Sequence, residues 1–410
     1  MLTEKERQFN DILVGLAEEL DIPPSKYKQA VDRYSAVGNW LKVGEVDIYP
    51  QGSFRLGTVV RPIQDGKEAD YDVDLVCQLP MNKFSITAES LKQMVGNRLK
   101  ANLNYSRILD KEGRRCWTLE YAEEDGIGFH IDVLPSVPAT DTVKIKLNEA
   151  NVPSEYHKHA IDITDRDKDT GICSWLPSGS NPRGYALWFE DFNKSAFVRV
   201  EASQRKVIVE KYASIYASVE TVPDALIRTP LQRAIQILKR HRDMYFIDNP
   251  ETKPISMIIT TLATQAYNGE TELYTTIANI VDKLTNYNIS MLIRYVNGKW
   301  WIPNPVNPAE NFADRWNDED KGSEKVYAFF NWLKKISSDF ANLVNTKGLP
   351  MMSEGLRNSF GERITNSALK KYGRTFREDR ESGKLKIAFG TGILGSKGDA
   401  AVRNHTFYGS

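Results

Sequence analysis

The sequence predicts an α+β protein in which a mixed β-sheet is flanked by helices. Two observations carry this prediction. From Val46 onward, short alternating apolar runs are bounded by Gly, Pro or charged turns, a pattern typical of half-buried strands. Beyond Pro223, apolar residues recur at a period of 3.6 residues, which indicates amphipathic helices. We therefore expect a sheet-containing domain over residues 1–225 and a helical domain over residues 226–410.

Length and charge narrow the class of protein. The 410 residues correspond to two or three domains, and the 41% content of hydrophobic residues excludes a disordered chain. The 54 basic and 54 acidic side chains give a net charge of zero, so any nucleic-acid chemistry needs a local basic groove. Three distant cysteines without a CxxC pair argue against disulfides or a zinc ribbon and favour a reducing cytoplasm. The sequence shows no signal peptide and no membrane span.

Two helices are predicted before the first strand. Thr3 and Glu6 form a capping box for the first helix, which ends before Pro23. The second helix begins near Ser25 and ends in the glycine-flanked segment 38–44. We interpret both helices as scaffold.

Four short strands are predicted next, over residues 46–49, 71–77, 117–121 and 129–134. The polar stretch 162–183 is rich in Asp, Ser, Gly and Pro and predicts a long surface loop. The apolar segments 197–200 and 207–209 are compatible with either a strand or a helix.

Helices dominate the remainder of the chain. Thr229 and Pro230 begin a long basic helix, and further helices are predicted over 255–267 and 326–340, with a proline-containing loop at 302–311 between them. The segment 390–395 matches GxGxxG, but only 15 residues follow it and they do not open a helix. We therefore interpret it as a glycine-rich turn.

Three aspartates alternate along one predicted strand. Because side chains point to opposite faces with a period of two, Asp70, Asp72 and Asp74 share a face. Like charges roughly 6 to 7 Å apart along a strand repel, so a cation or a proton must offset them. A solvated edge strand is the common explanation for an isolated run of this kind. A calcium loop is excluded because Leu75 stands where that loop requires glycine.

Two neighbouring motifs favour a metal site over a solvated edge. Gly52 and Ser53 follow a predicted strand, where glycine allows close approach of a phosphate and serine adds a donor. Downstream, Asp132 is a lone acid in an apolar strand, which is expensive to bury unless it binds something. Together with Asp72 and Asp74, it predicts a divalent metal site.

These motifs, taken together, resemble a known family. Gly52-Ser53, the Asp72-Val73-Asp74-Leu75 run and Asp132 are similar to the core of polymerase-beta-type nucleotidyltransferases. The likeness extends over nearly the whole chain to bacterial cGAS-like enzymes, the CD-NTases of CBASS anti-phage systems, through segments 180–185, 231–243, 304–316 and 405–409. The resemblance implies a polymerase-beta-like core and a C-terminal helical domain, in a bilobed molecule with a central cleft.

The resemblance also implies roles for individual residues. Asp72, Asp74 and Asp132 would be the catalytic acids and would ligate two Mg²⁺ ions, for which Mn²⁺ can substitute. Asp70 precedes the family pattern by one pleat and is interpreted as an outer or structural acid. Nucleotide binding would involve Gln51, Gly52, Ser53, Lys239 and Ser256. For Lys239, the alternative is an ordinary solvated helix face.

The implied activity is the condensation of nucleoside triphosphates into a cyclic di- or trinucleotide that activates a separate effector. ATP is the first candidate substrate, followed by GTP or a pyrimidine nucleotide. The rivals are a template-independent polymerase of the oligoadenylate, tRNA-end or poly(A) type and a catalytically silent nucleotide-binding module. The neutral charge disfavours a long RNA acceptor. Segment 407–410 is a candidate contact for a regulator or conjugation partner, and we expect a cytoplasmic protein that does not bind membranes.

Overall fold

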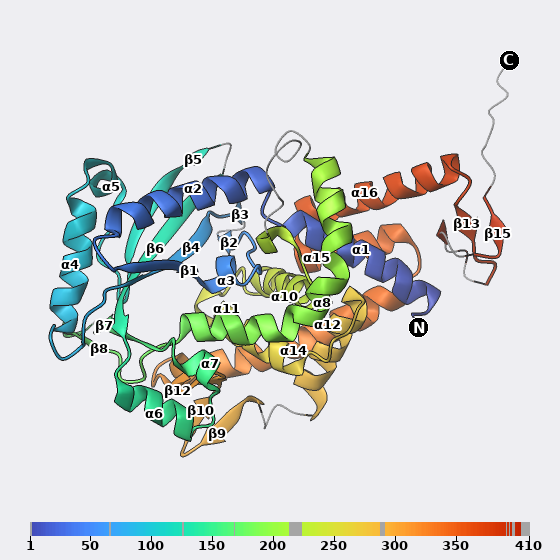
Figure 1. The fold of residues 1–410 in the computed structure, drawn as a ribbon. Coiled ribbons are helices and arrows are strands. Elements are labelled where there is room, and N and C mark those ends of the chain that lie inside the picture. Colours follow the sequence, from blue (N-terminus) through green and yellow to red (C-terminus); the bar gives the residue numbers. More distant parts are fainter. Residues whose placement is uncertain are drawn as a thin grey trace.

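The computed structural model describes residues 2–402, except 65–66, 125–126, 168, 213–223, 288–291, 391, 393 and 396–397. It places a six-stranded sheet on one side of the molecule and a group of packed helices on the other (Figure 1). The strand order is β1-β4-β6-β7-β8, with β5 pairing with β6. These strands are β1 (Asp47–Gln51), β4 (Tyr71–Gln78), β5 (Trp117–Glu124), β6 (Ile127–Pro138), β7 (Ile161–Arg166) and β8 (Cys173–Trp175).

The sheet is mixed, as the sequence predicts. The central strands β4 and β6 run parallel, and the other pairings are antiparallel. Along β4, Tyr71, Val73 and Leu75 are buried in an apolar core shared with α2 (Pro24–Leu41) and α4 (Ala88–Lys100). This burial fixes the register, because a slip by one residue would exchange the two faces. The alternating aspartates are thereby held on the opposite face.

The helical side contains α1 (Glu4–Leu20), α10 (Pro230–Tyr245), α11 (Ser256–Ala266), α12 (Leu273–Asp282), α14 (Gly322–Asn345), α15 (Leu349–Phe360) and α16 (Glu362–Glu381). Both predicted helix starts are confirmed: α1 has a capping box between Thr3 and Glu6, and α10 has one between Thr229 and Gln232. The first helix packs against α16, α10 and α12, so the start of the chain joins the C-terminal helices in one core.

Helix α8 (Pro182–Lys211) lies between the sheet and the helices in Figure 1 and includes both apolar segments, 197–200 and 207–209, that the sequence allows as strand or helix. Asn181 caps it, since its Oδ1 accepts a hydrogen bond of 3.1 Å from the amide of Gly184. The predicted surface loop over 162–183 is wrong in part, because β7 and β8 lie within it. Asp162, 1% exposed, is paired at 2.8 Å with Lys83, and this partner makes a polar strand tolerable.

The predicted proline-rich loop contains a small hairpin of β11 (Pro303–Asn304) and β12 (Asn307–Asn311). The last two residues of the GxGxxG segment form β14 (Leu394–Gly395), which pairs antiparallel with β13 (Lys386–Ile387), and residues 391 and 393 of the predicted turn lie outside the described residues. Segment 403–410, with the motif at 405–409 and the proposed partner contact at 407–410, lies outside the described residues. Across the residues that are described, no helix is both long and apolar enough to cross a bilayer.

Shorter elements account for the other helices and strands of the described residues. The helical turns are α3 (Gly52–Arg55), α5 (Leu103–Ile108), α6 (Asp141–Glu149), α7 (Ser154–His157), η1 (Asp224–Leu226), η2 (Pro250–Thr252), η3 (Lys283–Tyr287) and η4 (Asp314–Asn317). The remaining strands are β2 (Ile63–Gln64), β3 (Lys67–Glu68), β9 (Arg294–Val296), β10 (Lys299–Trp301) and β15 (Ala400–Ala401).

Candidate active site

Four residues form a row across the sheet. Gln51 on β1 pairs with Asp74 on β4, Asp74 pairs with Asp132 on β6, and Asp132 pairs with Thr118 on β5. Neighbouring strands lie about 4.8 Å apart, and residues in register present their side chains to the same face. Asp72 lies two residues before Asp74 and shares this face. The topology thus brings together the three aspartates that the sequence predicts. We call Asp72, Asp74 and Asp132 the acid row.

The electrostatics of Asp74 show that the fold does not compensate its charge. Burial raises the pKa of Asp74 to about 7, and the charges of Asp132 and Asp72 add to that rise, while Lys239 lowers it. The pKa of Asp72 is also raised, first because the surrounding protein removes part of its water shell. His130 opposes that rise with its charge, and Asp132 increases it. An additional cation would relieve both carboxylates.

Gly52 lies against Asp74 so closely that only glycine fits. A Cβ atom at this position would lie 2.3 Å from Oδ2 of Asp74, and the backbone φ of Gly52 is +62°. Both the contact and the left-handed φ exclude a side chain. The turn from β1 into α3 can therefore bring its backbone to the edge of the acid row.

Asp132 of the acid row and the nearby Asp70 have protein partners. Asp132 Oδ1 accepts a hydrogen bond of 2.6 Å from the hydroxyl of Thr118. Asp70 Oδ1 accepts one of 2.8 Å from the amide of Gly128, which agrees with a structural role. His130 lies between two acids, with Nε2 at 3.6 Å from Asp70 and Nδ1 at 3.7 Å from Asp72. Sequence reasoning did not assign a role to His130, although its spacing of two from Asp132 places it on the same face.

A cavity of about 300 Å³ opens beside the acid row, between the sheet and the helices. The sheet side contributes Gln51, Gly52, Asp74 and Asp132, and the opposite wall includes Tyr185, Met257, Asn304, Glu310 and Phe312. This volume is at the lower end of the range for small-molecule sites. Glu310 was not singled out from the sequence, even though it lies inside the 304–316 segment.

Three of the predicted nucleotide-binding residues are not among those that line this cavity. Lys239 is 2% exposed, and its Nζ donates to the backbone oxygen of Thr58 at 3.0 Å and to its hydroxyl at 3.1 Å. Burial lowers the pKa of Lys239 to about 7, so the alternative of a solvated helix face is wrong. The hydroxyl of Ser256 accepts a hydrogen bond of 3.0 Å from Arg242, and the backbone oxygen of Ser53 accepts one of 3.0 Å from Thr58.

The acid row fits a divalent cation by its chemistry. Carboxylate oxygens are hard ligands that suit Mg²⁺ or Mn²⁺. The half-buried carboxylate of Asp74, whose charge the fold does not neutralise, lies beside Asp132 and provides the negative field that such an ion needs. Among the described residues, no three His, Cys, Asp or Glu side chains already form a metal-binding group. The row therefore supplies donors on adjacent strands rather than a preassembled cage.

Comparison with known proteins gives the class of this one. Residues 46–135, which span β1, β4, β5 and most of β6, match the nucleotidyltransferase domain of the "cyclic GMP-AMP synthase DncV-like" family. The matched region contains the whole acid row. The protein is a nucleotidyltransferase.

Relatives that align from end to end narrow the family. The chain is 29% identical over 415 residues to a c-di-GMP synthase of Roseivirga ehrenbergii, covering 98% of this chain and 97% of that protein. It is 24% identical over 431 residues to the cyclic dinucleotide synthase CdnG of Bradyrhizobium diazoefficiens, covering 97% and 94%. Together with the matched domain, these relatives support a bacterial cGAS-like nucleotidyltransferase, a CD-NTase.

Solved structures confirm the α+β fold. CdnG of Bradyrhizobium diazoefficiens in complex with GTP superposes with a TM-score of 0.64 at 20% identity, over 89% of this chain and 99% of that one. CdnC of E. coli MS115-1 in its complex with HORMA-deltaN has a TM-score of 0.55 at 12% identity, over 85% and 96%. The predicted fold class is confirmed.

Proposed function

We propose that this enzyme joins two nucleoside triphosphates into a cyclic dinucleotide. In each of two steps a ribose hydroxyl attacks an α-phosphate, a new phosphodiester forms and pyrophosphate leaves. The observation that carries the proposal is the pairing of Asp74 with Asp132 on parallel strands beside a cavity. The names of the two end-to-end relatives favour a dinucleotide over the trinucleotide that the sequence left open.

Guanine nucleotides are the favoured substrates. One relative is named a c-di-GMP synthase, and CdnG was solved in complex with GTP. ATP, the first candidate from the sequence, is then the second substrate to test. The cavity beside the acid row is the candidate nucleotide site.

Asp72, Asp74 and Asp132 would hold two Mg²⁺ ions. When bound, such ions lower the pKa of the attacking hydroxyl and neutralise charge on the triphosphate. Gly52 lets the β1–α3 turn approach these acids without a side chain in the way. The hydrogen bond from Thr118 fixes the orientation of the Asp132 carboxylate.

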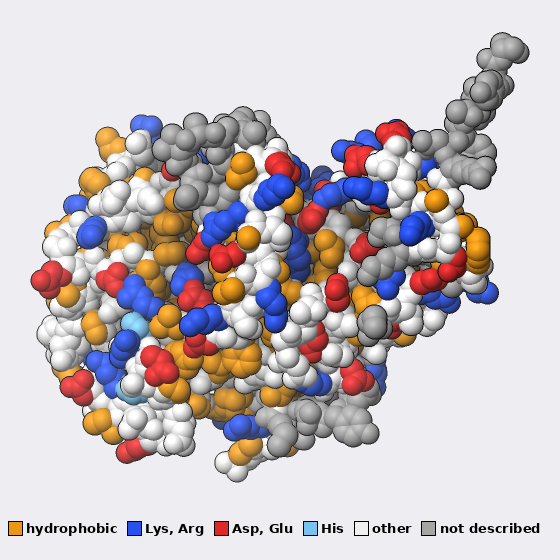
Figure 2. Space-filling view, turned by 45° about the vertical axis from the view of Figure 1, so that its right-hand side comes forward, with side chains coloured by type: hydrophobic (Ala, Val, Ile, Leu, Met, Phe, Trp, Pro, Cys, Tyr) orange, Lys and Arg blue, Asp and Glu red, His pale blue; other side chains and the backbone are white. Residues whose placement is uncertain are grey.

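Two rival activities remain testable. On the face shown in Figure 2, Lys and Arg side chains are interspersed with Asp and Glu, which does not favour a long RNA partner. A silent nucleotide-binding module does not by itself require an acid whose negative charge is compensated as poorly as that of Asp74.

The purified full chain should be incubated with Mg²⁺ and labelled GTP, with labelled ATP, and with both. A small product that resists phosphatase supports cyclisation. Extension of an added RNA would instead support the polymerase, and binding without any product would support the silent module. Either of these results overturns the proposal.

We also propose that the product is a messenger in anti-phage defence that activates a separate effector. The motif likeness to CBASS enzymes supports this role. A related CD-NTase, CdnC, forms a complex with HORMA-deltaN, which makes a regulatory partner a reasonable expectation for this chain as well. Bacteria that express the enzyme with its neighbouring genes should resist phage, and Asp74→Asn should remove that protection.

A further inference from the structure

Glu310 lies on β12 and lines the same cavity as Asp74. Its carboxylate Oε2 accepts a hydrogen bond of 2.7 Å from the amide of Asn304, and both of its oxygens lie 3.4 Å from the hydroxyl of Ser180. Asn304 is 2% exposed, and its Oδ1 accepts a hydrogen bond of 3.0 Å from the amide of Val306. The orientation of Asn304 is therefore fixed, and with it the position of Glu310.

The protein satisfies Glu310 only in part. An ionised carboxylate offers about four acceptor positions, and here the protein supplies only one strong donor and one long contact that the two oxygens share. Burial raises the pKa of Glu310 to about 7, although Asn304, Arg115 and Ser180 each lower it and Asp314 raises it slightly. A ligand that brings two more N–H donors would complete the site.

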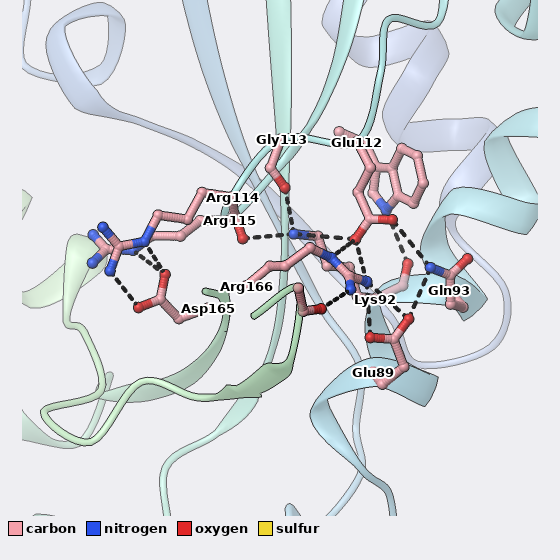
Figure 3. A network of polar contacts seen from close by, with 11 residues as sticks. Glu89, Lys92, Gln93, Glu112, Gly113, Arg114, Arg115, Asp165 and Arg166 are labelled. Atoms are coloured by element: carbon pink, nitrogen blue, oxygen red, sulfur yellow. Dashed lines mark hydrogen bonds and ion pairs between the residues drawn. The ribbon is translucent and has the colours of Figure 1, made fainter. Parts of the chain in front are cut away.

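Arg115 lines the cavity. Figure 3 shows the polar contacts that hold its loop in place. Arg114 donates to both carboxylate oxygens of Asp165, at 2.6 and 2.8 Å. Lys92, fully buried, donates to the backbone oxygens of Gly113 and Arg114 at 2.5 and 2.6 Å. The loop thus keeps the positive charge of Arg115 near Glu310, where it favours the ionised carboxylate.

Among the nucleobases, guanine matches an ionised carboxylate. Its Watson–Crick edge presents N1–H and the 2-amino group side by side, at the spacing of two carboxylate oxygens. Adenine presents one donor and one acceptor on that edge, so one contact would be repulsive. The cavity also offers apolar surfaces to a flat base from Tyr185, Met257 and Phe312. A site with buried acceptors of this kind strongly rejects an analogue that lacks the donors.

We infer that Glu310 is a specificity-determining residue that accepts the N1–H and 2-amino hydrogens of guanine. This inference rests on the proposed function, because it assumes that the cavity holds a nucleotide. Asn304 and Ser180 act through Glu310 as positioning residues. The acid row and the base-reading carboxylate then lie at different walls of one cavity.

Binding of α,β-methylene triphosphates tests the inference without turnover. The full chain should be titrated by calorimetry with the guanosine, inosine, xanthosine and adenosine analogues. The wild type should bind guanosine about tenfold tighter than inosine, which lacks the 2-amino group. Xanthosine, with an oxygen at position 2, should bind more weakly still.

Glu310→Gln should exchange these preferences. The glutamine amide can donate to the 2-oxo group of xanthosine while its oxygen accepts N1–H. Guanosine binding should fall about tenfold and xanthosine binding should rise about tenfold. Asp314→Asn removes a nearby exposed acid that does not line the cavity, and it should leave the guanosine-to-xanthosine ratio unchanged.

An unchanged guanosine-to-xanthosine ratio in Glu310→Gln, or an equal loss for every base, would overturn the inference and leave Glu310 as a structural residue. The proposed function fails in a different experiment. If the ratio inverts but the wild type makes no cyclic product, the role of Glu310 in guanine recognition is supported and the proposed synthase activity is refuted. If cyclic product forms and the ratio does not change, only the role of Glu310 in guanine recognition is refuted.

Discussion

Two runs of alternating aspartates, 70–74 and 165–169, differ in whether the fold compensates their negative charge. Asp72 and Asp74 lie on the central strand β4, Asp70 directly precedes it, and Asp74 lines the cavity. In the second run, Asp165 belongs to β7 and is paired with Arg114 and Arg115. Asp167 follows β7 in an exposed turn, where its Oδ1 accepts hydrogen bonds from the amides of Asp169 and Thr170.

The difference lies in which partner compensates the charge. Burial alone would raise the pKa of Asp165, but Arg114 and Arg115 outweigh it and hold that pKa below its usual range. The backbone and hydroxyl of Thr170 lower the pKa of Asp167. The pKa of Asp74 is instead raised to about 7. An acid that the fold has satisfied and one that still needs a ligand thus differ in the direction of the shift.

The largest expected effect comes from removing the uncompensated acids. Asp72→Ala with Asp74→Ala should lower cyclic product formation by roughly a thousandfold or more, because oxygen ligands for the metal ions are lost. Product is measured after phosphatase treatment, and circular dichroism checks the fold. The matched control is Asp167→Asn with Asp169→Asn, which should retain activity within about twofold. Equal losses in both double variants would contradict the assignment of the acid row.

Substitution of Gly52 should have the next largest effect. Gly52→Ala places a Cβ against Asp74 and should lower the turnover rate by about a hundredfold, since displacement of a catalytic group by about 1 Å costs this much. Gly44 has a similar φ of +64°, but a Cβ there meets nothing within 4 Å. Gly44→Ala therefore shares the backbone strain without the clash and should lose stability alone. If both variants were equally inactive, contact with Asp74 would not be the cause.

Stability should change in opposite directions in the two runs. In EDTA at pH 8, Asp74→Asn should stabilise the chain by about 2 kcal/mol, because it removes a half-buried charge that repels Asp132. Asp165→Asn should destabilise it by about 1 kcal/mol through the loss of charge-assisted hydrogen bonds from Arg114.

The stabilising contribution of Asp165 should also depend on pH. Since its folded pKa is lowered, that contribution is present above the unfolded pKa of about 4 and is lost as the pH falls through the folded value. Urea titrations of Asp165→Asn and the wild type at pH 8 and below pH 4 measure the difference, which should shrink in acid. A difference that is constant with pH would exclude the arginine pairs as its source.

The sequence was sufficient for features that local patterns decide. The alternation along β4 predicted the acidic face, and the capping box at Thr3 and the N-cap at Thr229 before Pro230 predicted two helix starts. Asp132 could be placed on a strand, but its pairing with Asp74 depends on a parallel register between segments far apart in the chain. The cost of burying a lone acid suggested that Asp132 shares a metal site with Asp72 and Asp74, but no local pattern gave the register that brings them together.

The sequence was insufficient where residues distant in the chain determine the environment of a polar side chain. The polar sequence around Asp162 is typical of a loop, but in the fold Lys83, which is distant in sequence, compensates the buried carboxylate. Lys239 resembles a solvated charge until α10 packs it against Thr58. Glu310 gains significance only because Asn304 and the distant Ser180 hold it at the cavity. In each of these cases a long-range contact, which no local pattern encodes, decides the environment of the side chain.

The smallest expected effect concerns the partner of Asp132. Thr118→Val preserves the shape of the side chain but removes the hydroxyl that donates to Asp132 Oδ1. A hydrogen bond to a charged group contributes about 1 to 2 kcal/mol, so the turnover rate should fall about tenfold and the Mg²⁺ concentration for half-maximal rate should rise. Thr118→Ser restores the hydroxyl and should recover most of both. If serine failed to do so while valine impaired the enzyme, packing on β5 rather than orientation of the carboxylate would be responsible, and Asp132 would have to be held in place by the sheet register alone.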